Sequence, residues 1–207
     1  MKLYFAPGTC SMASWISLEW IGKPYETHKV EIHGTKSPEL LEHNPMGAVP
    51  TLEDDAGNWW TQNVAVLNYL ADSFPQARIG SDGTPKGRAD LNRWLGFLTS
   101  DMHQSFKPLF GAIDGTGDAK TIDAIKAKYR EALKSRFGLL DKHLAGGKWA
   151  LGDHHSVADA YLFVMTTWAP KVGVDIGGFH NLQDFIKRMR ADPAVKHVLA
   201  EEAKEAA

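Results

Sequence analysis

The periodicity of apolar residues changes near residue 76, and this change constrains the fold more than any other feature. Up to that point strand-like and helix-like segments alternate along the chain. Gly, Pro, Ser and Asp then accumulate, and beyond them every periodic segment is helical. We therefore predict an α/β domain at residues 1–76, a linker at 77–86 and an all-helical domain at 87–207.

The first domain is predicted to be a mixed four-stranded sheet with helices packed against it. Its segments follow the order βαβαββα, with strands at 2–5, 25–32, 49–53 and 59–61 and helices at 11–21, 37–43 and 62–74. The second domain is predicted to hold a helix with an apolar stripe from Leu91 to Met102, ending near Pro108, and further helices at 121–144, 158–169, 181–190 and 193–203. The segment 158–169 is apolar almost all round, which is typical of a helix buried on every side, whereas we expect 201–205 to be solvated.

The composition excludes several classes of protein. The 207 residues carry a formal net charge of −2 with a pI near 6.5. The chain therefore lacks the excess of positive charge that would indicate a nucleic-acid partner. No apolar run approaches the roughly 18 residues that a membrane span needs, and Pro7-Gly8 interrupts the N-terminus before a secretory signal can form. The single cysteine excludes a disulfide framework and cysteine-based metal sites. We expect a cytoplasmic protein with no metal and no membrane association.

That single cysteine, Cys10, lies between a predicted strand and a predicted helix, directly after a Pro-Gly turn. Free backbone N–H groups and the helix dipole at such a position favour a thiolate, so we predict a lowered pKa. Ala13 occupies the position of the second cysteine of a Cys-x-x-Cys motif. A redox cycle would therefore need a small thiol from solution. The alternative is a buried, inert cysteine, the commoner fate of a lone thiol.

Two further runs indicate a ligand site. If the Val49–Pro50 bond is cis, the backbone N–H and C=O of Val49 turn outward and can pair with an extended peptide, although most such bonds are trans. Gln62 or Asn63 can cap the helix that follows, where free N–H groups would accept a carboxylate. A plain helix cap is the alternative.

The helical half contributes one structural motif and one candidate site residue. Ser156 and Asp159 have the spacing of a capping box, which we interpret as a folding motif worth on the order of 1 kcal/mol. His103 lies at the edge of the apolar stripe. It is either a partly buried histidine with one hydrogen bond, or a donor or base facing the first domain across a cleft. The adjacent pair His154 and His155 point apart and do not predict a metal site.

In this order and spacing the motifs resemble a glutathione S-transferase, specifically the bacterial beta class, from residue 1 to about 195. The resemblance is carried by Lys2-Leu3-Tyr4, Pro7-Gly8, Cys10-Ser11, Asn44-Pro45-Met46-Gly47-Ala48-Val49-Pro50, Thr61-Gln62-Asn63-Val64-Ala65, Asn68-Tyr69-Leu70-Ala71-Asp72, His103, Lys107-Pro108-Leu109-Phe110 and Ser156-Val157-Ala158-Asp159-Ala160-Tyr161-Leu162. It implies a thioredoxin-like N-terminal domain, an all-helical C-terminal domain, a cytosolic homodimer and glutathione as co-substrate at the junction of the two domains.

The resemblance also implies roles for individual residues. Cys10 would face the glutathione sulfur and form a mixed disulfide with it, while Val49, before a cis Pro50, would pair with the cysteinyl backbone. Gln62 and Asn63 would hold the γ-glutamyl end. From the helical domain, His103 and its neighbour Gln104 would reach the site. A bound thiolate also needs a donor, which Ser11 or the backbone N–H of Cys10 would supply.

The chain departs from the family pattern at three places. Gln62-Asn63 stand where Glu and then Ser or Gly are usual, Gln104 stands where well-studied members have Lys, and Gly96 stands where some have Asn. The predicted function is a transferase that uses glutathione for thiol–disulfide exchange through Cys10, for conjugation to small electrophiles, or for both. The alternative is a non-enzymatic interaction or regulatory protein that keeps the fold.

Overall fold

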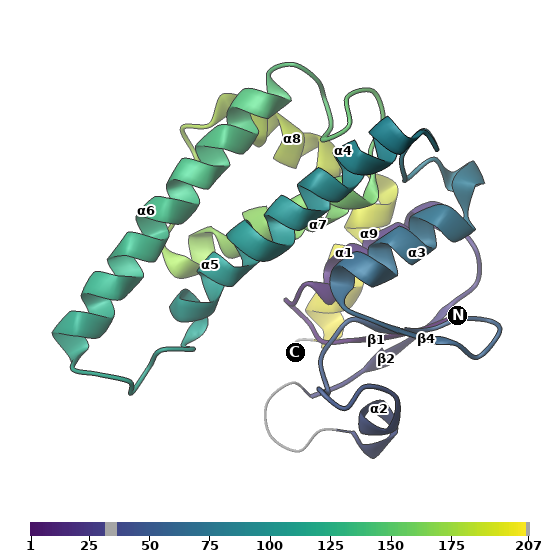
Figure 1. Cartoon of the computed structure of the whole chain (residues 1–207), viewed down its shortest axis with the longest axis horizontal. Coiled ribbons are helices and arrows are strands. Elements are labelled where there is room, and N and C mark those ends of the chain that lie inside the picture. The colour runs from purple at the N-terminus through teal and green to yellow at the C-terminus, as the bar shows by residue number, and fades with distance from the viewer. Residues whose placement is uncertain (32–36, 206–207) are drawn as a thin grey trace.

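The computed structural model describes residues 1–31 and 37–205 and consists of a sheet-containing half and a helical half (Figure 1). The sheet has the strand order β2-β1-β3-β4, with β1 at Lys2–Phe5, β2 at Glu26–Lys29, β3 at Thr51–Glu53 and β4 at Trp59–Thr61. β1 pairs with β2 in parallel and with β3 antiparallel, and β3 pairs with β4 antiparallel. The predicted mixed sheet is confirmed. The strand predicted at 25–32 ends at Lys29, and position 32 lies outside the described residues.

Three helices cover this sheet: α1 at Ser11–Ile21 and α3 at Asn63–Ser73 on one side, and α2 at Pro38–His43 on the other (Figure 1). Ser37 caps α2 and Pro38 is its first residue, as predicted. α1 is buried continuously from Ser11 to Leu18, because it lies between the sheet and helices α7 and α9 of the other half. Its start, where Cys10 lies, is therefore enclosed by both halves.

The helical half contains α4 at Pro85–Gly96, a π-helical segment at Phe97–His103 (η2), α5 at Gln104–Phe106, α6 at Ala119–Leu144, α7 at Val157–Trp168, α8 at His180–Ala191 and α9 at Pro193–Glu205. Short 3₁₀ turns lie at Pro75–Ala77 (η1), Lys107–Phe110 (η3) and Pro170–Val172 (η4). The prediction of one regular helix carrying the stripe from Leu91 to Met102 was wrong in this respect. The helix widens to i→i+5 bonding over seven residues that end at His103.

Helix α7 lies in the middle of the helical half, and its burial on nearly every side is confirmed. The carboxylate of Asp159 accepts hydrogen bonds from the backbone N–H and the hydroxyl of Ser156 at 2.9 and 2.7 Å, and from the backbone N–H of Ala150 at 2.8 Å. The folding role predicted for Ser156 and Asp159 fits these contacts. Burial raises the pKa of Asp159 to about 6, although the hydrogen bonds act against this shift.

Packing involves the predicted linker and corrects the expectation of a solvated tail. Within the predicted linker, Ile79 is fully buried and its carbonyl accepts a hydrogen bond from the backbone N–H of Val157 at 2.8 Å, so this part of the segment is docked on α7. In the predicted solvated tail, Glu202 is only 7% exposed, because one face of α9 packs on α1. The division into residues 1–76 and 87–207 stays a prediction. No helix in the described part of the chain has the length and apolarity to cross a membrane.

Candidate active site

The Cys10 turn and the loop before β3 meet at one point. The Cys10 side chain is 9% exposed, and its Sγ donates to the backbone carbonyl of Val49 at 3.5 Å. The Val49–Pro50 peptide bond is cis, as predicted. Among the described residues the backbone N–H of Val49 has no hydrogen-bond partner. The thiol and this free backbone edge are therefore neighbours, which the sequence could indicate only through two motifs about 40 positions apart.

The lowered pKa predicted for Cys10 is contradicted by the structure. Burial raises the pKa of the thiol to about 12, and only the residue's own backbone N–H acts in the other direction. The next N–H groups of the helix start are already occupied, since those of Ser11 and Met12 are bound by the side chain and carbonyl of Thr9. The helix terminus thus offers less to a thiolate than its position in the sequence suggested.

Ser11 holds the turn together and does not face a ligand. Its side chain is fully buried, and its hydroxyl contacts the Thr9 hydroxyl at 2.7 Å and both the N–H and the carbonyl of Ala6 at 3.3 Å. The predicted role as a direct donor to a bound thiolate is not compatible with these contacts. The backbone N–H of Cys10 remains as the other predicted donor.

The start of α3 differs from the predicted cap. Gln62 has a positive φ of 69° and is exposed, with its amide nitrogen 3.9 Å from the sulfur of Met46, and neither Gln62 nor Asn63 caps the helix. Asn63 turns inward: its Oδ1 accepts from the Ser14 hydroxyl at 3.2 Å, and its Nδ2 is buried without a partner. What this helix start offers a ligand is its backbone, since the structure records no partner for the N–H of Asn63 in the described part of the chain.

The helical half closes the site with two aromatic residues and His103. The indole N–H of Trp168 donates to the carbonyl of Gly8 in the Cys10 turn at 2.9 Å. The His103 ring packs edge-on against Trp168 with 4.9 Å between ring centroids, and its Nδ1 lies 2.7 Å from the hydroxyl of Tyr161. Burial and the nearby Lys107 cation lower the pKa of His103 to about 4. The imidazole is therefore neutral at pH 7.

Comparison with known proteins identifies the arrangement. Family models for the glutathione S-transferase N-terminal domain and C-terminal domain match residues 8–73 and 100–193. The chain belongs to the glutathione S-transferase family. Glutathione S-transferase GST-4.5 of Xanthomonas campestris is 44% identical over 203 residues, which are 98% of each chain.

Solved structures of this family are similar to this chain over nearly its whole length. A beta-class glutathione S-transferase of Sphingomonas chungbukensis is 37% identical, with a TM-score of 0.86 over 98% of both chains. A sphingomonad glutathione S-transferase solved in complex with glutathione is 36% identical, with a TM-score of 0.87 over 98% of this chain and 99% of that one. The family and the fold inferred from the sequence are confirmed.

Two of the departures from the family pattern lie on the surface of the helical half. Gln104 is exposed, and its amide nitrogen reaches the carbonyl of Thr99, 3.5 Å away in the π-helical segment. Gly96 is exposed at the end of α4, and a Cβ there would meet no atom within 4 Å. The ligand roles predicted for Gln104, Gln62, Asn63 and His103 stay predictions.

Sequence reasoning missed three residues that shape this candidate site. Trp168 and Tyr161 were assigned to a buried helix, and Glu202 to a solvated tail. The backbone N–H of Gly8 donates to Glu202 Oε2 at 3.3 Å, while Oε1 is buried without a partner. Burial raises the pKa of Glu202 to about 7. The polar tips of Trp168 and Tyr161 in an otherwise apolar helix were the available signal.

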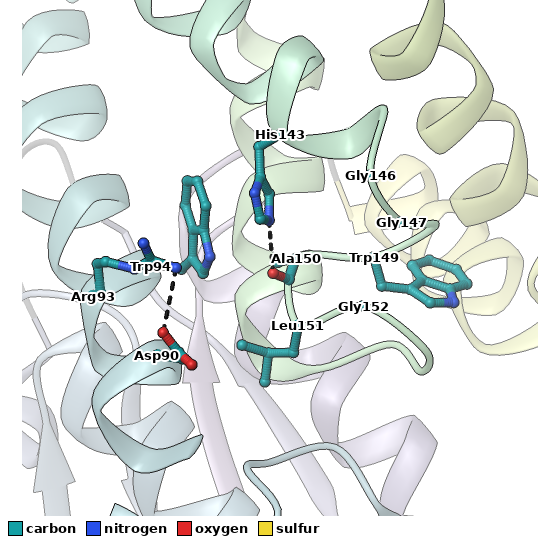
Figure 2. Close-up of a pocket in the computed structure, with 10 residues that line it drawn as sticks. All are labelled: Asp90, Arg93, Trp94, His143, Gly146, Gly147, Trp149, Ala150, Leu151 and Gly152. Carbon is teal, nitrogen blue, oxygen red and sulfur yellow. Dashed lines mark hydrogen bonds and ion pairs between the residues drawn. The ribbon is translucent and has the colours of Figure 1, made fainter. Parts of the chain in front are cut away.

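A separate cavity of about 280 Å³ lies between α4 and the loop that follows α6 (Figure 2). Trp94, His143, Trp149 and Gly147 are among its lining residues, and none of the predicted site residues lines it. Its polar side chains already have partners: Arg93 contacts Asp90 at 3.3 Å, and Nε2 of His143 is 2.8 Å from the carbonyl of Ala150. We assign no ligand to this cavity.

Proposed function

We propose that this chain is a glutathione transferase that binds glutathione at the junction of its two halves and catalyses attack of its thiolate on small apolar electrophiles, so that the whole glutathionyl group becomes attached through sulfur. The observation that carries the proposal is the convergence on Cys10: its thiol bonds the Val49 carbonyl, and Trp168 ties the same turn to the helical half. The similar proteins described above are named as transferases, so the non-enzymatic alternative gains no support from them.

Glutathione is an extended tripeptide with a carboxylate at each end, and the site offers matching groups. The unpaired N–H of Val49, and its carbonyl beside the Cys10 thiol, suit the backbone of the cysteinyl residue. The free N–H at the start of α3 suits the carboxylate of the γ-glutamyl end, where the helix dipole adds to the attraction. This pose brings the ligand's sulfur to the Cys10 turn.

The electrophile would bind against an aromatic surface of the helical half. Phe110 is 51% exposed, stacks on Phe106 with 5.8 Å between ring centroids, and meets the edge of Trp168 at 5.5 Å. Trp168 and His103 connect this surface to the Cys10 turn. An exposed apolar surface beside a reactive sulfur favours uncharged, aromatic or aliphatic substrates.

The protonation state of Cys10 favours conjugation over thiol–disulfide exchange. Exchange needs a Cys10 thiolate, which burial disfavours, whereas conjugation uses the thiolate of glutathione itself. Exchange remains the second candidate because Cys10 lies at the place where the ligand's sulfur would arrive. In that reaction the Cys10 thiolate attacks glutathione disulfide and releases one glutathione thiolate.

The test measures binding, conjugation and exchange on one pair of proteins, the native chain and Cys10→Ala. Isothermal titration measures glutathione binding, and absorbance follows conjugation of 1-chloro-2,4-dinitrobenzene. Mass spectrometry after incubation with glutathione disulfide detects a glutathionyl adduct. We expect both proteins to bind glutathione and to conjugate the electrophile, with at most a slow adduct on the native chain.

Other outcomes would redirect the proposal. A native chain without measurable glutathione binding would contradict it outright. Rapid formation of one adduct on the native chain, together with loss of conjugation in Cys10→Ala, would favour exchange. We also propose a homodimer in the cytoplasm, as the family resemblance implies, and sedimentation velocity would test the assembly.

A further inference from the structure

The contact between Tyr161 and His103 joins the most buried helix of the molecule to the proposed site. Tyr161 is 1% exposed on α7, and its hydroxyl oxygen lies 2.7 Å from Nδ1 of His103. His103 ends the π-helical segment, and its ring also packs on Trp168. The imidazole is thus held by one hydrogen bond and one ring contact.

The surroundings of the Tyr161 hydroxyl indicate which way its proton points. Tyr161 is buried, and His103 Nδ1 at 2.7 Å is the one hydrogen-bond partner that its hydroxyl has among the described residues. If Nδ1 carried the imidazole proton, the proton of the buried hydroxyl would have no acceptor, which is costly. The proton of the hydroxyl is therefore directed to Nδ1 of His103.

We propose that Tyr161 is a positioning residue that fixes His103 as the neutral tautomer protonated at Nε2. A neutral imidazole carries one proton, so a hydrogen bond accepted at Nδ1 leaves the proton on the other nitrogen. The low pKa of His103 supports the proposal, because only a neutral imidazole exists as two tautomers, between which Tyr161 can select. Lys107 is the charged group that acts on this ring, and Tyr161 is the titratable group that faces it from α7, with Cys10 in turn acting on Tyr161.

In the selected tautomer, Nε2 of His103 is a hydrogen-bond donor that points away from Tyr161 and is available to a ligand. Nε2 has no hydrogen-bond partner in residues 1–31 and 37–205, and it is not among the buried unpartnered atoms, so it is open to solvent. An N–H there attracts a thiolate or carboxylate, whereas the opposite tautomer would present a lone pair and repel it. This last step rests on the proposed function, since it requires glutathione in the cleft. The tautomer itself does not.

The first test reads the tautomer directly. In ligand-free protein labelled with ¹⁵N-histidine, long-range ¹H–¹⁵N spectra at pH 7 distinguish a protonated nitrogen from a bare one. We expect His103 to be protonated at Nε2, and to change toward a tautomer mixture in Tyr161→Phe, which keeps the aromatic ring. Tyr25→Phe is the matched control, because its hydroxyl is bound to Trp15 at 2.8 Å and to Glu19 in the other half. It should leave the His103 signals unchanged.

The second test asks whether Tyr161 acts through His103. We expect Tyr161→Phe to lower kcat/KM for glutathione about tenfold. This factor corresponds to the loss of one hydrogen bond from Nε2 of His103 to a charged group of glutathione. In a His103→Phe background the same substitution should have no further effect, because the group through which it acts is gone. A purely structural role would instead lower kcat/KM equally in both backgrounds.

The outcomes separate this inference from the proposed function. A native His103 protonated at Nδ1, or an unchanged spectrum in Tyr161→Phe, would overturn the inference even if glutathione binds. Equal effects of Tyr161→Phe with and without His103 would overturn it as well. A native protein with the expected tautomer but no glutathione binding would contradict the proposed function and leave the role of Tyr161 in setting the tautomer intact.

Discussion

Asp159 and Tyr161 are both fully enclosed on helix α7, two residues apart, yet their surroundings differ in kind. Both oxygens of Asp159 are used, and three donors from Ser156 and Ala150 hold them. Around Tyr161 only the bond to His103 is formed, and the buried Asn63 Nδ2 and Thr99 Oγ1 are left without partners. Unsatisfied buried polar groups are costly, and they persist where function compensates for them.

The helix itself separates the two clusters. Residues at positions i and i+2 point about 200° apart around an α-helix, so their side chains cannot share partners. Asp159 is directed at the loop that precedes α7, while Tyr161 is directed at the π-helical segment and the Cys10 turn. One helix therefore fixes the fold on one side and the candidate site on the other.

The largest effect is expected on the site side, in the reactivity of Cys10. A pKa near 12 leaves about a thousandfold less thiolate at pH 7 than the ordinary thiol value of 9.0. A more basic thiolate is also more nucleophilic, which recovers part of this loss. We predict that iodoacetamide alkylates the folded, ligand-free protein on the order of 100-fold more slowly than the urea-unfolded chain, as measured by mass spectrometry.

The pH profile of the same reaction makes the prediction sharper. The rate should rise about tenfold per pH unit up to pH 10 without a plateau, because the thiol is still mostly protonated there. The chain has one cysteine, so every adduct reports on this position. A plateau near pH 7 would mean that the thiol is already ionised. The raised pKa of Cys10, which distinguishes the site side of α7 from its folding side, would then be contradicted.

The next largest effect is expected on the folding side. Asp159→Ala removes a helix cap and leaves two backbone N–H groups and the Ser156 hydroxyl buried without an acceptor. We expect the free energy of unfolding to fall by about 3 kcal/mol in urea denaturation at pH 7. Asp118→Ala is the matched control, since Asp118 caps the exposed start of α6 through Thr121. It should cost only about 1 kcal/mol. Equal losses in the two variants would show that burial adds nothing to the Asp159 cap.

The local elements could be predicted from the sequence because their signals are local. The 11–21 helix with its Gly22 end, the Ser37-Pro38 start of α2 and the short β4 strand agree with the structure. Each depends on turn residues and apolar spacing within a few positions. The cis Val49–Pro50 bond came from the same reasoning, together with the family resemblance.

The features that could not be predicted all depend on how the two halves pack. The inward turn of Asn63, the burial of Glu202 and the raised pKa of Cys10 each arise where α1 meets the helical half. A helix N-terminus indicates a stabilised thiolate only if its N–H groups are free and water reaches it, and neither condition is visible in a sequence. The π-helical widening before His103 has no sequence signal that we can identify.

A smaller effect is expected in the pH dependence of stability. The pKa of Asp159 is raised from 3.8 to about 6 on folding, so the stability that it contributes is present below about pH 4 and is lost as the pH rises through 6. Asp159→Asn removes this titration. We predict that the stability of the native chain relative to the variant falls by about 1 kcal/mol between pH 5 and pH 7.5, measured by urea denaturation. A rise over the same interval would mean that the cap, not burial, governs the carboxyl group.

The smallest effect is expected from Gln104→Lys, which restores the cation that well-studied relatives carry beside the histidine. Gln104 is exposed, so a charge there acts through water and is screened. An attraction of about 0.5 kcal/mol corresponds to a KM for glutathione roughly twofold lower at low salt, with kcat unchanged. The gain should disappear in 0.5 M NaCl, and Gln104→Met, which is uncharged and of similar length, should show none of it. A tenfold gain that survives high salt would place position 104 inside the water-excluded site. The enclosed region around Tyr161 would then extend further along the π-helical segment than the structure indicates.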